Sequence, residues 1–139
     1  MRNTLRLALV GVIAVGTLGV GASVASAADS NCPLGAACAF DGYAYSGPTV
    51  VTAYNNTNLW GTSYNDDASS AAANGRNCKY SRFYADTTYS SGGSGPYFTL
   101  YSKYKLGYNY QDPDLSNGAG YNGSGNWDNR VSAIEFAGC

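Results

Sequence analysis

Two short polar segments of the chain carry residue types that can bind a hard metal ion. Residues 65–70 (NDDASS) and 128–133 (DNRVSA) share the pattern Asx-Asx-x-x-Ser followed by a small residue, and we call them the two sextets. Each offers a carboxylate or amide at its second position, a hydroxyl at its fifth position and turn carbonyls, which are the oxygen ligands that calcium prefers. The pattern therefore predicts weak calcium binding, with these candidate side-chain ligands: Asp66, Ser69, Asn129 and Ser132.

A second pattern precedes each sextet, so the chain contains an internal repeat. The aromatic hexad Phe40-x-x-x-x-Tyr45 precedes the first sextet, and Tyr84-x-x-x-x-Tyr89 precedes the second. The same order in both halves indicates a duplicated structural unit. Hexad and sextet begin 25 positions apart in the first unit and 44 in the second, so the second unit has 19 extra residues. We expect this insert within residues 90–111, as a binding loop or as a hairpin that only lengthens a sheet.

Other structures could explain the sextets without a metal. Short polar side chains of this kind also form Asx-turns and Ser-turns, in which they bond only to the local backbone. Residues 67–74 combine a capping residue, an alanine run and a following Gly75, which together could form a two-turn helix. The sequence leaves both alternatives open for the first sextet.

The first 27 residues have the pattern of a secretory signal peptide. Arg2 and Arg6 precede the apolar run 7–20, and Ala-Ser-Ala at 25–27 forms a cleavage site. We expect an exported, soluble and monomeric protein with one domain at residues 28–139. That domain has 6 basic and 9 acidic residues, a net charge of −3, which disfavours nucleic acid or an anionic membrane as a partner.

Composition and periodicity favour an all-β fold. The chain has 13 Tyr and 18 Gly, and short extended runs alternate with Gly, Asn and Ser, which is typical of strands and turns. In the last run Ile134 and Phe136 share one face, and we expect both to be buried. The predicted strands are 37–40, 49–54, 77–84, 97–104, 107–111 and 130–136.

The cysteines predict a disulfide framework. Four cysteines, Cys32, Cys38, Cys78 and Cys139, all lie in the exported part, and they allow three pairings. We favour Cys32 with Cys38 and Cys78 with Cys139, which would stabilise the fold by about 2 and about 4 kcal/mol in the chain-entropy model. Zinc is the alternative, and the absence of His and of a C-x-x-C pair disfavours it.

Catalysis is disfavoured by what the chain lacks. It has no His to serve as a general base, and its cysteines are expected to be oxidised. Glu135 is the only Glu, so a glycosidase-like carboxylate pair would depend on Asp66 or Asp67, which fit a turn or a ligand set better. We therefore expect a protein that is not an enzyme.

The repeat resembles a known fold family. Phe40-x-x-x-x-Tyr45-x-Gly47 is similar to the aromatic signature that opens a βγ-crystallin Greek key, and the sextets resemble that family's calcium motif, Asn/Asp-Asn/Asp-x-x-Ser/Thr-Ser. The resemblance implies a βγ-crystallin-like sandwich of two Greek-key motifs, the second with an insertion. The chain departs from the pattern at residues 90–92, where x-Gly does not follow the second hexad at once, and at Ala133, where the motif has Ser.

In the resembled family each calcium site combines oxygens from both halves. The resemblance then implies that Asn65 and Asp128, at the first positions, shape the paired loops more than they dominate binding. Asn129 in place of Asp lowers the charge of one site. We expect calcium to stabilise the domain and not to switch it.

The segment 32–38 (CPLGAAC) running into the first hexad is similar to the secreted actinobacterial metalloproteinase inhibitor family. That resemblance implies a peptidase inhibitor, with an extracellular protease as partner and a rigid loop presented to it, which lowers the entropy loss on binding. The family's loop is braced by a second short-range disulfide, and no Cys pair here can do the same, so the reactive bond is not transferred. The candidate contact residues in the insert are Ser90, Tyr97, Tyr101, Tyr104 and Tyr108.

The alternative function is a structural or glycan-binding module of the cell envelope, and a killer-toxin-like role is a further one. Glycan binding would use an exposed aromatic face that stacks on sugar rings, made from Tyr104, Tyr108, Tyr110, Tyr121 and Trp127. Trp60 and Trp127 each lie just ahead of a sextet. We expect both tryptophans to be core anchors beneath their loops.

Overall fold

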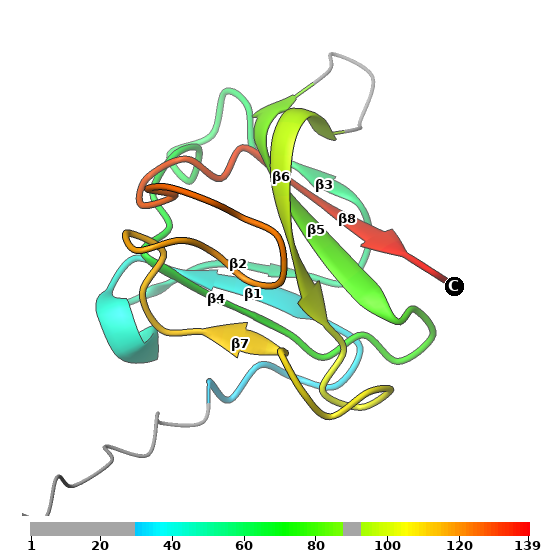
Figure 1. The fold of residues 1–139 in the computed structure, drawn as a ribbon. Helices are drawn as coiled ribbons and strands as arrows, with labels where there is room; N and C mark the ends of the chain where they lie inside the picture. Colours follow the sequence, from blue (N-terminus) through cyan, green and yellow to red (C-terminus); the bar gives the residue numbers. More distant parts are fainter. Residues whose placement is uncertain (1–29, 88–92) are drawn as a thin grey trace, which may run out of the picture.

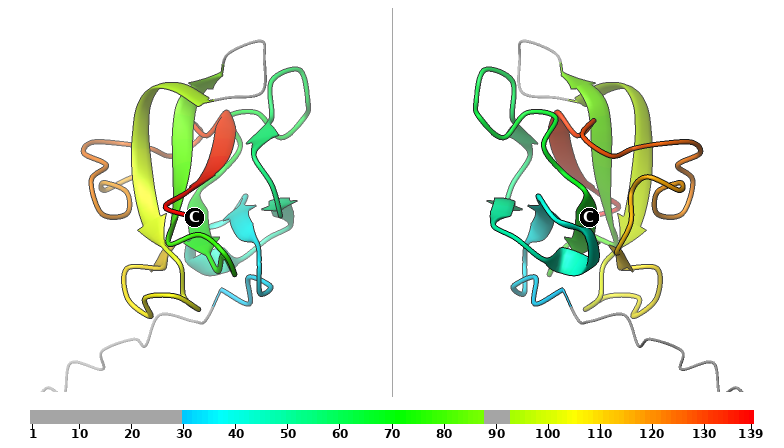
Figure 2. Two further views of the ribbon diagram at one scale, coloured as in Figure 1. Left: turned by 90° about the vertical axis from the view of Figure 1, so that its right-hand side faces the viewer. Right: turned by 90° about the vertical axis from the view of Figure 1, so that its left-hand side faces the viewer.

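The protein is a two-layer sandwich of β-strands (Figures 1 and 2). The computed structural model describes residues 30–87 and 93–139, so the predicted signal peptide lies outside the described residues. In chain order the elements are β1 (Ala37–Phe40), η1 (Tyr43–Tyr45, a 3-10 turn), β2 (Thr49–Ala53), β3 (Thr57–Asn58), β4 (Ser70–Ala73), β5 (Tyr80–Thr87), β6 (Gly93–Tyr101), β7 (Gln111–Asp112) and β8 (Ala133–Ala137). The predicted all-β class is confirmed.

The two sheets show that the halves of the chain interlock. Sheet A has the order β2-β1-β4-β7 and sheet B the order β3-β8-β5-β6. Each half, β1 to β4 and β5 to β8, keeps three strands in its own sheet and lends its third strand to the other. Thus β3 pairs with β8, and β7 pairs with β4, both antiparallel. The order of one sheet is the order of the other with every strand replaced by its equivalent, so the predicted duplication is confirmed as two Greek keys.

The helix considered for residues 67–74 does not form. Ser70–Ala73 is β4, which pairs with β1 on one side and β7 on the other. All four residues of β4 are buried, and two of its alanines lie opposite alanines of β1, Ala37 with Ala73 and Ala39 with Ala71. Alanine prefers helices, but that local preference is weak, and pairing at the centre of a sheet overrides it.

The predicted strands differ from the observed ones in both halves, and β3 and β4 of the first half were not predicted. The prediction for β1 is correct, and those for β2 and β8 are within three residues. β5 and β6 reach further toward each other than predicted, because they continue as one hairpin to Thr87 and Gly93. Of the predicted strand 107–111 only Gln111 belongs to a strand, because the N–H groups of Leu106 and Gly107 donate to the carbonyl of Ser102 and form a turn.

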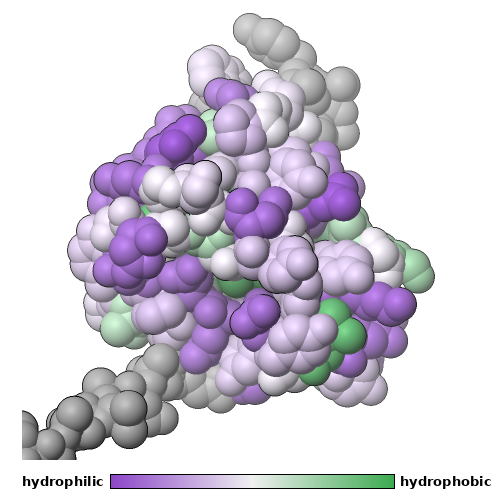
Figure 3. Space-filling model, viewed as in Figure 1, coloured by the Kyte–Doolittle hydropathy of each residue, from purple (hydrophilic) through white to green (hydrophobic). Residues whose placement is uncertain are grey.

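The hydrophobic core lies between the sheets and is built around aromatic rings. Phe83 and Phe98, both fully buried, stack with their centroids 4.8 Å apart, and the edge of Trp127 meets Phe98 at 5.1 Å. Burying a side chain of this size contributes about 2 to 3 kcal/mol. Ile134 is buried as predicted, whereas Phe136 is only half-buried at the margin of the core. The surface seen in Figure 3 is mostly hydrophilic or near neutral.

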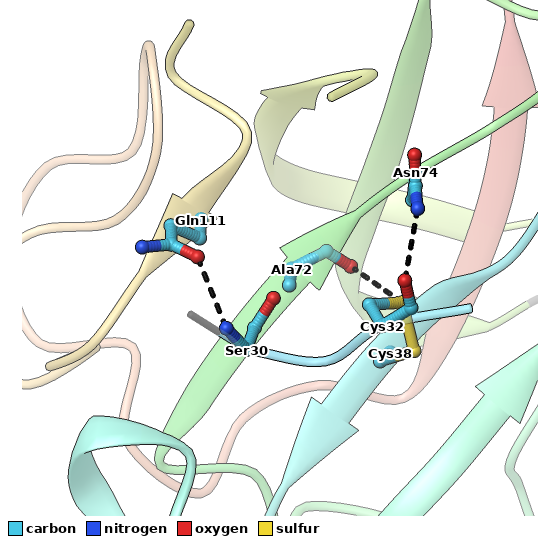
Figure 4. Close-up of a disulfide and its surroundings, with 6 residues drawn as sticks. All are labelled: Ser30, Cys32, Cys38, Ala72, Asn74 and Gln111. Carbon is cyan, nitrogen blue, oxygen red and sulfur yellow. Dashed lines mark hydrogen bonds between the residues drawn. A yellow bond between two sulfur atoms is a disulfide. The ribbon is translucent and has the colours of Figure 1, made fainter. Parts of the chain in front are cut away.

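Two disulfides join the cysteines in the pairing favoured from the sequence, Cys32–Cys38 and Cys78–Cys139. The first is buried against β4 (Figure 4): a Cys32 sulfur lies 3.8 Å from the carbonyl of Ala72, and the Asn74 amide donates to the carbonyl of Cys32 at 2.9 Å. The second ties the exposed C-terminal residue to the segment before β5. It therefore closes much the longer loop.

The extra residues of the second half are spread over three connections. Phe40 pairs with Thr49 across the first hairpin, while Tyr84 pairs with Tyr97 across a longer second hairpin. The connection from β6 to β7 is also longer than that from β2 to β3, and the largest addition is the loop 113–132 between β7 and β8. This loop closes the edge formed by β6 and β7 (Figure 1). The insert is therefore not confined to residues 90–111.

Candidate functional site

The two sextets pair with each other through their backbones. The Asp66 N–H donates to the carbonyl of Val131 at 3.0 Å, and the Asn129 N–H donates to the carbonyl of Ala68 at 2.9 Å. Position two of each sextet thus bonds to position four of the other. Asp66 and Asn129 also share a left-handed backbone, with φ of 58° and 56°, which Asn and Asp tolerate best among residues with a side chain. We call this symmetric arrangement the sextet clasp.

One side of the clasp is rich in oxygen. The Ser132 hydroxyl donates to Oδ1 of Asp66 at 2.8 Å, although the two residues are 66 positions apart. Both line a cavity of about 200 Å³ together with Trp60 and Asp86. Asp86 lies in β5, two residues after the first aromatic residue of the second hexad. This side of the clasp therefore brings two carboxylates and a hydroxyl to one cavity.

Both first positions of the sextets hold a buried oxygen without a partner. Oδ1 of Asn65 and Oδ1 of Asp128 are inaccessible and accept no hydrogen bond within the described residues. Their other polar atoms are engaged: Asn65 Nδ2 donates to Asp66 at 2.7 Å, and Oδ2 of Asp128 accepts from the Tyr43 hydroxyl at 3.1 Å. A buried oxygen without a donor is unfavourable by about 1 to 3 kcal/mol, and a cation would satisfy it.

The other side of the clasp differs in its charge and its contacts. Here Asn129 stands where the first side has the carboxylate of Asp66. Within the described chain, the Asn129 side chain makes no hydrogen bond with Ser69 that would match the bond between Asp66 and Ser132. Instead, Asn129 Nδ2 lies 3.5 Å from Oδ2 of Asp128. The hydrogen bond from Tyr43 to Asp128, together with partial desolvation, raises the pKa of the Tyr43 hydroxyl above its usual value. Tyr43 therefore stays protonated and holds Asp128 in place.

The donor set of the clasp fits calcium in kind. In the part of the chain that the structure describes, no three His, Cys, Asp or Glu side chains gather as a metal cluster. A cation would depend on Asp66 and Asp86 on one side of the clasp or on Asp128 on the other, together with amide, hydroxyl and main-chain oxygens, which are hard ligands. Zinc would need nitrogen or sulfur ligands, and the cysteines are in disulfides.

The two tryptophans ahead of the sextets differ, so one of the two predictions is wrong. Trp127 is 3% exposed and packs on Phe98, as expected of a core anchor, whereas Trp60 is 64% exposed. Trp60 follows the short strand β3 at the margin of sheet B, where its N–H donates to the Asn58 side chain. No second layer covers it there, and it becomes a wall of the Asp66 cavity.

The predicted contact residues do not form one cluster. Ser90 lies outside the described residues. Tyr97 and Tyr101 lie in β6, and Tyr108 packs on Tyr101 with ring centroids 5.0 Å apart. Tyr104 is exposed in the turn that follows β6, at the end opposite the hairpin.

The predicted aromatic face for glycans is also divided. Tyr104, Tyr108 and Tyr121 are exposed, but Trp127 belongs to the core. Tyr110 is half-buried, and the Lys103 ammonium lies 5.3 Å from its ring centroid. Tyr121 instead packs on Tyr101, at 5.2 Å between centroids.

The comparison with protein families decides to which family the chain belongs. Residues 25–98 match the model of peptidase inhibitor family I36, and this stretch includes the first hexad and sextet as well as β1 to β5 and the first part of β6. The chain belongs to peptidase inhibitor family I36. It is therefore a peptidase inhibitor-like protein, not an enzyme, and its expected partner is a protease. No curated protein matches the sequence significantly.

Solved structures agree on the fold. A βγ-crystallin from Ciona intestinalis is 17% identical, with a TM-score of 0.51 over 73% of this chain and 99% of that one. A βγ-crystallin from an archaeon is 17% identical, with 0.50 over 75% and 99%. A structure described as "Evolution of the eye lens beta-gamma-crystallin domain fold" is 16% identical, with 0.54 over 81% and 95%. At these identities the similarity shows the βγ-crystallin fold alone.

The structure adds residues that the motifs did not single out. Tyr43 and Asp86 both lie inside or beside a hexad and reach the clasp, so aligning the two hexads with the opposite sextets could have found them. In the sequence, Tyr80 and Arg82 appeared only as residues of a predicted strand, without a motif.

Among the described residues no helix has the length and hydropathy to cross a bilayer.

Proposed function

We propose that this protein is exported and inhibits an extracellular metalloproteinase. The match of residues 25–98 to peptidase inhibitor family I36 carries the proposal. The signal-peptide pattern of residues 1–27 and the two disulfides support export, since disulfides persist outside the cytosol. The metalloproteinase class rests on the resemblance of residues 32–38 and the first hexad to secreted metalloproteinase inhibitors.

The β5–β6 hairpin is the proposed contact element. β8 pairs with β5 only as far as Tyr84, whereas β5 and β6 continue to Thr87 and Gly93, so the hairpin projects beyond the sheet (Figure 1). The start of β6 is braced against β8, because the Gly93 N–H donates to the Glu135 carboxylate at 2.8 Å. A Cβ on Gly93 would collide with the Tyr84 ring, so β6 packs closely on Tyr84 at this point. A braced element loses less conformational entropy when it binds.

A protease panel tests the proposal. Purified residues 28–139 are titrated against a thermolysin-like metalloproteinase and a subtilisin-like serine protease, with peptide hydrolysis as the measurement. We expect stoichiometric loss of metalloproteinase activity and no effect on the serine protease. Full activity of both enzymes at large molar excess would exclude inhibition of these two classes, and inhibition of the serine protease alone would exclude the metalloproteinase assignment.

A variant in β8 that removes the brace on Gly93 tests the contact element. Glu135→Ala removes a charged acceptor, so we expect inhibition to weaken roughly tenfold while the fold persists. Tyr54→Ala is the matched control, because Tyr54 is an exposed residue between β2 and β3. Equal inhibition by both variants would place the contact elsewhere.

We also propose that calcium stabilises the sextet clasp. The hydrogen-bonded pair of Asp66 and Ser132 on one side of the clasp, and the unpartnered oxygens of Asn65 and Asp128 at the first positions of the paired sextets, support this. Bound calcium would supply positive charge to these oxygens and cross-link the two halves. Asn65 and Asp128 would then bind calcium directly, in addition to the side-chain ligands predicted from the sequence.

Thermal melts with calcium and with chelator test the clasp. We expect calcium to raise the Tm of the wild type, because a ligand that binds only the native state stabilises it. Asp66→Asn should reduce that rise more than Asp67→Asn, because Asp66 faces the cavity and Asp67 does not line it. An identical Tm in calcium and chelator for the wild type would exclude the clasp as a calcium site.

A further inference from the structure

The outer face of sheet B carries a row of large side chains from two neighbouring strands. In the register of β5 and β6, Tyr80 lies opposite Tyr101, Arg82 opposite Thr99, and Tyr84 opposite Tyr97. The intervening residues Phe83 and Phe98 point into the core, so this row faces outward by strand alternation. The left view of Figure 2 shows β6, β5 and β8 side by side in this layer.

Three tyrosine rings gather around Tyr101. Its ring centroid lies 5.4 Å from Tyr80, 5.0 Å from Tyr108 and 5.2 Å from Tyr121. Tyr121 is held there by the loop 113–132, because its N–H donates to the carbonyl of Thr99 in β6 at 2.8 Å. The long loop of the second half therefore completes a wall that the strands alone would lack.

These rings border a groove of about 250 Å³ that also has polar groups. Arg82, Thr99 and Asn122 line it together with the tyrosines. The Arg82 guanidinium lies 5.2 Å from the centroid of the Tyr97 ring, which fixes the plane of the guanidinium and leaves N–H groups at its edge. The groove therefore combines flat aromatic surfaces with hydrogen-bond donors.

The lining of the groove carries one kind of charge. Arg82 is the one charged residue among the described residues that line it, and none of them is acidic. Glu135 lies opposite Arg82 in the register of β8, and its carboxylate accepts the N–H of Gly93. Within the groove itself, Arg82 is the group that can pair with an anionic ligand.

We propose that this groove binds a carboxylated oligosaccharide, with sugar rings against Tyr101 and Tyr121 and a sugar carboxylate against Arg82. The flat C–H face of a pyranose matches an aromatic ring, while tyrosine hydroxyls and Asn122 can bond to sugar hydroxyls. Tyr97 and Tyr101 are four residues apart in one strand, about 13 Å, so the groove accepts more than one sugar unit. This binding activity is separate from peptidase inhibition.

Paired probes test the ligand class on residues 28–139. Oligogalacturonate carries a carboxylate on each ring, and its methyl ester keeps the rings without the charge. We expect calorimetry to detect binding of the free acid, with the ester about tenfold weaker, because a charge-assisted hydrogen bond is lost. Equal binding of acid and ester, or no binding of the acid, would overturn the proposal.

Substitutions test the groove itself. Tyr121→Ala, at an exposed loop position, should weaken binding of both probes roughly tenfold through lost stacking, and Arg82→Gln should remove the preference for the acid over the ester. Tyr54→Ala, an exposed tyrosine between β2 and β3, is the control and should bind as the wild type. A melt for each variant confirms folding. Wild-type binding by both Tyr121→Ala and Arg82→Gln would overturn the proposal, whereas peptidase inhibition is measured independently and fails or succeeds by itself.

Discussion

The first half of the chain, β1 to β4, and the second half, β5 to β8, share one topology but differ in how they use it. Each contributes three strands to one sheet and one strand to the other. The first half is compact, with short connections and small buried alanines in β1 and β4. The second half has the long β5–β6 hairpin, the loop 113–132 and the tyrosine groove.

The difference shows which parts of a duplicated fold are constrained. The sextet clasp is nearly symmetric, because each half supplies the backbone partner of the other. The connections face solvent on one side, so they can lengthen without disturbing the strand pairing. The added residues also close the edge of β6 (Figure 1), which protects an edge strand from pairing with another chain.

Replacing the two equivalent tryptophans should give the largest contrast between the halves. Trp127→Ala should lower the free energy of unfolding by about 3 to 5 kcal/mol, because it leaves a cavity beside Phe98. Trp60→Ala should change it by no more than about 0.5 kcal/mol, because Trp60 is exposed. Urea unfolding of both variants measures the difference, and similar values would refute the assignment of Trp127 alone to the core.

Removing each disulfide should give the next largest contrast in stability between the halves. In the chain-entropy model, Cys78→Ala/Cys139→Ala should lower the free energy of unfolding by about 4 kcal/mol and Cys32→Ala/Cys38→Ala by about 2 kcal/mol. The reason is that the Cys78–Cys139 loop spans 61 positions, whereas the Cys32–Cys38 loop spans 6. Urea unfolding of the two double variants gives the comparison. A larger loss for the Cys32–Cys38 pair would show that its packing against β4 outweighs loop entropy.

The two clasp serines should distinguish the sides of the clasp. Without calcium, Ser132→Ala should lower stability by about 1 to 2 kcal/mol, because Asp66 loses a buried donor. Ser69→Ala should have a smaller effect, since its hydroxyl makes no matching bond to Asn129. Thermal melts in chelator measure both effects. Equal losses of stability would mean that the two sides of the clasp contribute equally although their side-chain contacts differ.

The smallest expected effect concerns pH. The hydrogen bond to Asp128 raises the pKa of Tyr43 in the folded state, so the stability that Tyr43 contributes is full below about pH 10 and is lost as the pH rises through the raised pKa. Tyr43→Phe should therefore make stability fall less steeply above pH 10. Thr87→Val, at the corresponding place in β5, is the control. Parallel alkaline melting curves for Tyr43→Phe and the wild type would contradict the effect.

The sequence predicted the parts of the fold that depend on neighbouring residues. Strand β1, the favoured disulfide pairing and the repeat of hexad and sextet were all visible, because each depends on local pattern or on simple counting. The predictions failed where distant partners decide. No strand was predicted at Ser70–Ala73, where a helix was left open, but these residues are held as β4 by β1 and β7, and the predicted strand 107–111 is largely a turn.

The candidate site was predicted in the same uneven way. The sextets were recognised from their oxygen-bearing residues, and calcium binding by them stays a prediction. Their mutual pairing was expected only through the resemblance to the fold family. The roles of Tyr43 and Asp86 depend on which hairpin folds over which sextet, so aligning hexads with sextets identifies these residues only when the exchange between the halves is taken into account.

Amino-acid order alone determined that this protein is a duplicated, disulfide-linked β-domain, since turn residues, strand periodicity and cysteine number act over short distances or by simple count. Tertiary structure decided which tryptophan is buried, how the halves exchange β3 and β7, and which tyrosines border a common groove. These outcomes depend on contacts between residues far apart in the chain, as with Asp66 and Ser132. Such contacts form only when both sheets are complete, and local propensity does not specify them.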